Sequence, residues 1–292
     1  MSANYPSLYG QQFATQVELL LQQKMSVLRP AVTEGVYRGE QASPVDQVGA
    51  VAMSEVTSRF GPIVRTDAPV ARRWVAPTPF DLAQQVDTFD KLKVLSDPMN
   101  VYTQNAVAAY NRKVDDVLIA AYYANAQTGK SGTGSTAFTS GNELAVGAGA
   151  SGDVGMTSKK LRMILKLMYD NNVPADSQIF GILSPQAHDD LLAETVVSNK
   201  DYTDKPVLVD GVVKRHLGIN FMISNRLPTS SGDRRIPIFV KGGLHLGVWE
   251  NNIFSVDQRK DLEGHPWQIY NKAMIGATRL QENLCYSILC NE

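Results

Sequence analysis

The stretch from residue 31 to 79 limits the fold most, because it can neither form a helix nor bury itself. Short β-prone segments at 50–57, 63–66 and 70–75 alternate with charged side chains, so that no apolar face is left. Nine Gly and Pro residues break this stretch: Gly35, Gly39, Pro44, Gly49, Gly61, Pro62, Pro69, Pro77 and Pro79. The pattern predicts a long, projecting β-ribbon. Since isolated two-stranded ribbons are marginal in water, we expect it to lie on a neighbouring subunit.

Side chains of this ribbon are the candidate contact residues between subunits. Guanidinium groups form two parallel hydrogen bonds with carboxylates, and aromatic rings commonly anchor interfaces. The predicted inter-subunit contacts are Arg59, Arg65, Arg72, Arg73 and Trp74.

Helices are expected on both sides of the ribbon. Asp97-Pro98 is a strong helix start, and an apolar stripe through Val107, Val114, Leu118 and Ala121 predicts a helix over 98–127. About 30 residues would span roughly 45 Å, which makes this helix a strut. A second amphipathic pattern predicts a helix over 11–29 whose apolar stripe needs a distant partner.

The remainder of the chain combines a loop with an α/β unit. Residues 128–155 are rich in Gly, Ser, Thr and Ala and predict a flexible surface loop or a ribbon tip. Helices are expected at 157–171 and from Ser184-Pro185 to about Glu194, with a strand at 178–183 between them and a polar loop after them. The later strand candidates are Val207–Val213, Ile219–Ser224, Ile236–Val240, Leu244–Trp249, Ile269–Ile275 and Leu284–Cys290.

Bulk composition narrows the classes of function. The net charge of −1 over 292 residues gives no basic field for a dedicated nucleic-acid binder. Cys285 and Cys290 are expected to be two packed thiols. The start of the chain lacks the features of a signal peptide, and no segment approaches about 18 consecutive apolar residues, so we expect the protein to be made in the cytoplasm.

The candidate enzyme and metal-site motifs lack the structural context or the spacing that their chemistry requires. Ala124-x-x-x-x-Gly129-Lys130-Ser131 satisfies a loose phosphate-loop pattern, but that mechanism needs a strand before the loop and a helix after it. Here a helix precedes the motif. The four histidines His188, His216, His245 and His265 show no paired ligand spacing. We therefore predict a structural protein without catalytic, cofactor or metal sites.

The order of these parts resembles the major capsid proteins of tailed double-stranded-DNA phages, which have the HK97-type fold. Three further stretches resemble that family: the Ser184–Leu192 run SPQAHDDLL, the Gly218–Pro228 run GINFMISNRLP and the Lys241–Val248 run KGGLHLGV. The resemblance implies an α+β fold whose parts are an N-terminal arm at 1–34, an extended E-loop ribbon at 35–80, a peripheral domain at 81–174 and a mostly axial domain at 175–292. The peripheral domain would contain the spine helix and the loop at 128–155, and strands at about 240–275 would return to it.

The resemblance also implies a function and partners. Subunits would form pentamers and hexamers that close into an icosahedral shell around double-stranded DNA, in the virion capsid. No lysine occurs in 35–80, which excludes a covalent link from an E-loop lysine, and a separate scaffolding protein and a portal are expected. The closest alternative is an encapsulin-type nanocompartment shell. A nucleotide-binding enzyme that uses Lys130 and Ser131, and a tail or surface structural protein, are alternatives of other classes.

Overall fold

The computed structural model describes residues 22–42, 45–55, 58–59, 61–63, 65–86, 99–150, 152–194 and 212–292. Residues 11–21 of the predicted helix over 11–29 lie outside the described residues. So do the helix start at Asp97-Pro98, the loop after Glu194 and most of the strand predicted at 207–213. Within the described part, residues 22–28 are not helical and residues 212–213 are not a strand, so both predictions are wrong there.

The chain forms two compact units that are discontinuous in sequence. One unit contains residues 1–25, 79–113 and 250–274, and the other contains 26–78, 114–249 and 275–292. Three elements run from one unit into the other: α2 (Met99–Tyr123), β13 (Leu244–Gln258) and β14 (Trp267–Arg279). The named capsid domains with their sequence boundaries stay a prediction.

A mixed seven-stranded sheet organises the larger unit. Its strand order is β7-β15-β12-β8-β10-β9, and β11 pairs with β12. The strands are β7 (Glu143–Leu144), β8 (Ile179–Leu183), β9 (Arg215–His216), β10 (Ile219–Ile223), β11 (Thr229–Ser230), β12 (Asp233–Val240) and β15 (Cys285–Cys290). The strands predicted at 178–183, 219–224, 236–240 and 284–290 are confirmed. Their apolar side chains form the core, in which Ile236, Ile238 and Phe239 are fully buried.

Two capped helices belong to the same unit. α3 (Ser158–Asp170) begins after Thr157, whose hydroxyl accepts a hydrogen bond from the Lys160 amide, and it buries Leu161, Ile164 and Met168. α4 (Pro185–Ala193) begins after Ser184, whose hydroxyl accepts from the Ala187 amide. Both helices agree with the sequence prediction, because local caps and an apolar stripe determine them.

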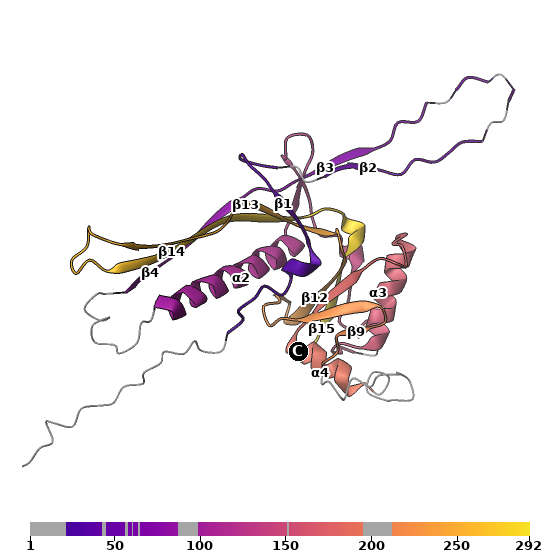
Figure 1. The fold of residues 1–292 in the computed structure, drawn as a ribbon. Helices are drawn as coiled ribbons and strands as arrows, with labels where there is room; N and C mark the ends of the chain where they lie inside the picture. Colours follow the sequence, from indigo (N-terminus) through magenta and orange to yellow (C-terminus); the bar gives the residue numbers. More distant parts are fainter. Residues whose placement is uncertain are drawn as a thin grey trace, which may run out of the picture. The chain divides into compact units, whose positions relative to one another are not determined.

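A second, four-stranded sheet carries the ribbon. Its order is β2-β3-β5-β6, from β2 (Asp46–Val48), β3 (Val70–Trp74), β5 (Ala126–Thr128) and β6 (Gly134–Thr136). Figure 1 shows β2 and β3 side by side, with the connection between them extending beyond their ends. Of the three β-prone segments predicted in the ribbon, 70–75 is confirmed as β3. The described residues of 50–57 and 63–66 form no strand, and the partner of β3 is β2 at 46–48, so the ribbon is paired only near its base.

Residues 128–155 were predicted to form a flexible surface loop or a ribbon tip, and the flexible loop is wrong for the first half of this segment. β5 and β6 form a hairpin, a 3₁₀ turn follows at Ser140–Asn142, and β7 joins the seven-stranded sheet beside β15.

Glycines permit close packing where the chain enters the ribbon. β1 (Thr33–Val36) pairs in parallel with the start of β13, and the register places Gly35 opposite Gly247. A Cβ atom on Gly35 would meet the Tyr37 ring, and one on Gly247 would lie 2.8 Å from the Trp249 ring. The two rings stack at a centroid distance of 5.4 Å, so small residues make room for this aromatic pair.

The smaller unit contains β4 (Thr78–Val86), the first part of α2 and the distal parts of β13 and β14. β4 is an edge strand in the order β1-β13-β14-β4. Ala106 is buried, and Tyr110, nearly buried, donates a hydrogen bond to Asn251 Oδ1 at 2.9 Å. Of the predicted apolar stripe, Val114 and Leu118 are fully buried, whereas Val107 is 38% exposed between the buried Ala106 and Ala108.

Candidate functional site

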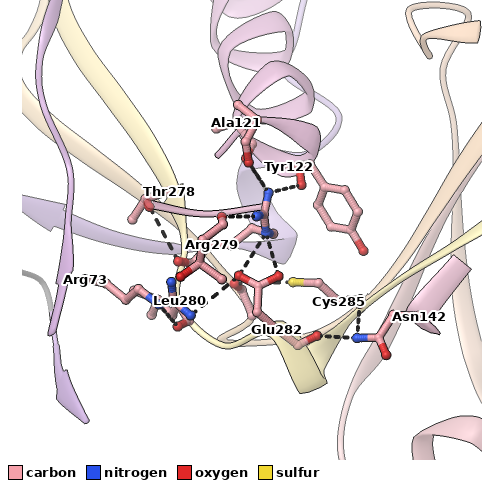
Figure 2. Close-up of polar contacts among 12 residues, drawn as sticks. Arg73, Ala121, Tyr122, Asn142, Thr278, Arg279, Leu280, Glu282 and Cys285 are labelled. Carbon is pink, nitrogen blue, oxygen red and sulfur yellow. Dashed lines mark hydrogen bonds and ion pairs between the residues drawn. The ribbon is translucent and has the colours of Figure 1, made fainter. Parts of the chain in front are cut away.

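A buried arginine at the end of β14 holds the C-terminal end of α2. Arg279 is fully buried, and its guanidinium donates hydrogen bonds to four main-chain carbonyls (Figure 2). They belong to Ala121 at 3.3 Å, Tyr122 at 2.5 Å, Ala124 at 2.5 Å and Thr136 at 3.2 Å. A cation is favourable at this negative end of the helix dipole, and the last carbonyls need donors. The helix therefore ends at Tyr123, and the prediction that it continues to residue 127 is wrong.

A single carboxylate serves two guanidinium groups in this cluster. Glu282 forms ion pairs with Arg279 at 3.1 Å and with Arg73 at 3.5 Å. Arg73 Nε donates to the Leu280 carbonyl at 3.0 Å, whereas Arg73 Nη1 is buried without a hydrogen-bond partner among the described residues. Burial lowers the pKa of Arg73, and Glu282 opposes this effect in part. Positive charge therefore exceeds negative charge at the base of the ribbon.

Neutral groups complete the cluster. Asn142 Nδ2 donates to the carbonyls of Glu282 at 2.7 Å and Cys285 at 3.1 Å (Figure 2). Burial raises the pKa of the Cys285 thiol to about 12, so this thiol is neutral and adds no charge. Cys285 and Cys290 are both free and buried, which confirms the prediction of two packed thiols.

The five predicted contact residues of the ribbon lie in two places. Arg59 and Arg65 are exposed on the connection between β2 and β3, where Arg65 pairs with Asp67 at 3.2 Å. Arg72, Arg73 and Trp74 lie on β3. Arg72 binds both oxygens of Asp46, at 2.5 and 2.7 Å, and the Trp74 indole N–H donates to the Gly129 carbonyl at 2.7 Å.

Arg73 requires a correction. Its side chain was expected on the ribbon surface, facing a neighbour, but it is 7% exposed and is held by Leu280 and Glu282 of its own chain. The alternation of side chains along β3 turns it inward. For the other four residues the contact with a neighbouring subunit stays a prediction.

Comparison with known proteins identifies the family. The model of the phage capsid protein family matches residues 6–292, nearly the whole chain. The chain belongs to the phage capsid protein family. A search of curated proteins gave no match for this capsid protein.

Solved structures show the fold of this phage capsid protein. The capsid structure of cyanophage P-SCSP1u aligns with a TM-score of 0.76 at 17% identity, over 100% of this chain and 96% of that one. The capsid asymmetric unit of cyanophage Pam1 aligns with a TM-score of 0.78 at 11% identity, over 99% and 98%. Mycobacterium phage Che8 gives 0.74 at 13% identity, over 98% of both chains.

These matches confirm the predicted HK97-type α+β fold and the major capsid protein that forms the shell of a virion. They favour the phage capsid over the encapsulin alternative.

The phosphate-loop motif of the capsid protein has the wrong surroundings for nucleotide binding. Gly129, Lys130 and Ser131 lie in the turn of the β5–β6 hairpin, with a strand on each side. Amide groups and a helix dipole therefore do not converge there as a phosphate loop requires. The enzyme alternative that used Lys130 and Ser131 loses its structural basis.

Histidines of the capsid protein serve as structural hydrogen-bonding groups. His245 lies between the Thr33 hydroxyl at 2.9 Å and the Tyr37 hydroxyl at 2.8 Å, and His188 Nε2 accepts from the Val213 amide at 3.1 Å. His216 lies 3.2 Å from the Ser158 hydroxyl. This is not a catalytic triad, because Glu194 binds Ser158 directly. The described ranges contain no group of three or more metal-ligating side chains.

Asp115 on α2 holds residues 26–28, near the start of the described chain. It is fully buried and accepts hydrogen bonds from the Ser26 hydroxyl at 2.5 Å, the Val27 amide at 3.0 Å and the Leu28 amide at 3.2 Å. These bonds hold residues 26–28 in an irregular conformation. They are one physical reason why the predicted helix over 11–29 does not extend to this segment.

Sequence reasoning missed three residues of the capsid protein: Arg279, Glu282 and Asp115. An arginine between two predicted apolar strands, Ile269–Ile275 and Leu284–Cys290, with a glutamate three positions later, was an available signal for a buried ion pair. Asp115 gave no such signal, because the sequence does not distinguish it from its neighbour Asp116. Asp116 is partly exposed and pairs with Arg226. In the described part of the chain, no helix is long and apolar enough to cross a membrane.

Proposed function

We propose that this capsid protein assembles into pentamers and hexamers that close into an icosahedral shell around the packaged double-stranded DNA, with the β2–β3 ribbon of each subunit lying over the next subunit. The observation that carries the proposal is a ribbon that is fixed at its base and uncovered along its length. The proposed function of the protein is structural and includes no catalytic step.

The base of the ribbon is rigid. Arg73 on β3 is bound to Leu280 and Glu282, and the Gln47 side chain on β2 donates to the Leu280 carbonyl at 2.5 Å. Both ribbon strands are therefore attached to the same point between β14 and β15. A fixed base gives a projecting arm one direction, and this reduces the conformational entropy that is lost when it binds.

The length of the ribbon carries uncovered apolar side chains. Met53 and Ile63, on the connection between β2 and β3, are essentially fully exposed, and Val48 and Val70 on the paired strands are more than two-thirds exposed. Single exposed apolar residues are common, but four on one arm favour an interface. Arg59, Arg65, Arg72 and Trp74 flank them as candidate polar contacts at its rim.

Further partners follow from the proposed assembly. A separate scaffolding protein and a portal are expected, assembly would take place in the host cytoplasm, and the outer surface leaves room for a decoration protein. The net charge of −1 suits a shell that holds DNA by enclosure and contacts it without sequence specificity. In this proposal residues 1–34 are the N-terminal arm, 35–80 the E-loop, 81–174 the peripheral domain and 175–292 mostly the axial domain.

Charge introduced on the ribbon tests the proposal. Met53→Glu and Ile63→Glu should leave the free subunit folded, because neither side chain contributes to its core, but they should abolish closed shells in negative-stain images after co-expression with the scaffolding protein. Tyr169→Glu is the matched control, since Tyr169 is half exposed on α3. Normal shells from both ribbon variants would contradict the proposed role of the ribbon.

A further inference from the structure

An open pocket of about 550 Å³ lies beside the base of the ribbon. β2 and β3 form one side of it through Asp46, Arg72 and Arg73, and the β5–β6 hairpin forms the other through Thr128, Lys130 and Thr136. All of these residues belong to the larger unit. The pocket therefore lies between the ribbon and the hairpin turn that contains Gly129, Lys130 and Ser131 of the phosphate-loop pattern.

The charges around this pocket do not balance. Three cationic side chains and one carboxylate line it, and Asp46 is already bound through both oxygens to Arg72. Arg73 shares Glu282 with Arg279, and its Nη1 atom is buried without a hydrogen-bond partner among the described residues. Lys130 is exposed at the rim. A surplus cation in a poorly solvated position favours an incoming anion.

The pocket is preorganised. The Trp74 indole N–H donates to the Gly129 carbonyl at 2.7 Å, and the Arg72 guanidinium lies 5.7 Å from the centre of the Trp74 ring. A Cβ atom at Gly132 would lie 3.4 Å from the same ring, so the turn packs closely on it. The backbone at Lys130 is thereby held against β3. A fixed turn reduces the entropy that is lost when the lysine forms an ion pair.

We propose that this pocket binds a side-chain carboxylate of a second copy of this chain, with the Lys130 amine in direct contact and Arg73 supplying charge from behind. The inference rests on the proposed assembly. The carboxylate of a single Asp or Glu side chain is small enough to enter such a pocket. A phosphate of duplex DNA belongs to a continuous backbone and stays outside it. Symmetric assembly brings the acidic residues of a neighbour close at high effective concentration.

Carbodiimide cross-linking of assembled shells tests the site. The reagent activates a carboxylate, a nearby lysine amine displaces the activating group, and an amide bond forms. Shells co-assembled from ¹⁴N- and ¹⁵N-labelled subunits should give mixed-isotope peptides that join Lys130 to an Asp or Glu residue. The same link should be absent from unassembled subunits. Lys241, an exposed turn lysine, is the internal reference for general reactivity.

Two variants separate charge from structure. Lys130→Arg keeps the charge and should disassemble at the same urea concentration as the unmodified shell, whereas Lys130→Gln should disassemble at a lower one. Lys241→Gln is the matched control. The site is contradicted if Lys130 forms cross-links only within its own copy. It is also contradicted if Lys130→Gln lowers the urea concentration of disassembly for DNA-filled shells but not for empty ones. Absence of any shell would instead overturn the proposed assembly on which the site depends.

Discussion

Arg279 donates a hydrogen bond of 2.5 Å to the carbonyl of Tyr122, although 157 residues separate the two in sequence. This contact ends the helix α2 and joins it to the same short segment that anchors the ribbon. Without Arg279 the four carbonyls would lose this donor, and Glu282 would keep only Arg73 as an ion-pair partner.

Removal of this guanidinium should destabilise the protein strongly. Arg279→Met keeps the bulk of the side chain but removes the donor of four carbonyls and the nearer of the two guanidinium partners of Glu282, and breaking a buried pair in this way costs about 3–5 kcal/mol. The urea midpoint of the unassembled subunit measures the effect. Arg259→Met is the control, because Arg259 pairs with Asp261 on the surface and should leave the midpoint nearly unchanged. Equal midpoints for both variants would show that the cluster is not important for stability.

Asp115→Asn should release residues 26–28 from α2. The amide keeps one acceptor oxygen but loses the charge that favours three donors, so we expect a loss of about 1–3 kcal/mol and local opening. Trypsin should then cleave after Lys24 at a lower protease concentration, as measured by mass spectrometry. Asp116→Asn, next to it on α2, breaks a partly exposed pair with Arg226 and should leave the Lys24 site protected.

Gly276→Ala should be poorly tolerated. A Cβ atom at residue 276 would lie 2.2 Å from the Ala76 carbonyl oxygen, and main chain cannot move aside as a flexible side chain can. The expected cost is about 3 kcal/mol or a loss of soluble protein, measured by the urea midpoint and by yield. Gly141→Ala provides the comparison, since its nearest neighbour would be 4.0 Å away. A normal midpoint for Gly276→Ala would contradict this close approach of the two segments.

Acid should destabilise the subunit through its buried histidines. Burial lowers the pKa of His245 and His216 below the ordinary value of 6.5, and Glu34 and Glu194 oppose this only in part. The unfolded chain therefore binds protons at a higher pH than the folded one. Stability is present above about pH 6.5 and is lost as the pH falls below it, by about 1.4 kcal/mol for each unit of pKa difference.

Urea midpoints at pH 7.5, 6.5 and 5.5 measure this dependence. His245→Gln should make it weaker, because the titrating group between Thr33 and Tyr37 is gone. His265→Asn, at an exposed position, should leave it unchanged. An unaltered dependence in His245→Gln would mean that other groups cause the acid sensitivity.

Much of the fold was predictable because its causes are local. Caps at Thr157 and Ser184 start α3 and α4, alternating apolar residues produce β8, β10, β12 and β15, and Gly and Pro exclude helix from the ribbon. β13 was predicted too short, because its second half is partly exposed and lacks a continuous apolar run. β14 was also predicted too short, because Gly276, Thr278 and Arg279 interrupt the apolar pattern although they are buried.

By itself, the sequence determined an α+β chain with a ribbon that its own residues cannot cover, a long helix before the α/β part, and no enzyme motif in a workable context. Only the tertiary structure decided where α2 ends, that Arg73 turns inward, and that Lys130 belongs to a basic pocket. The physical reason is distance along the chain: Arg279, Glu282 and Asp115 act on groups that local periodicity cannot relate to them, and their buried charges are satisfied only after the strands and helices have packed.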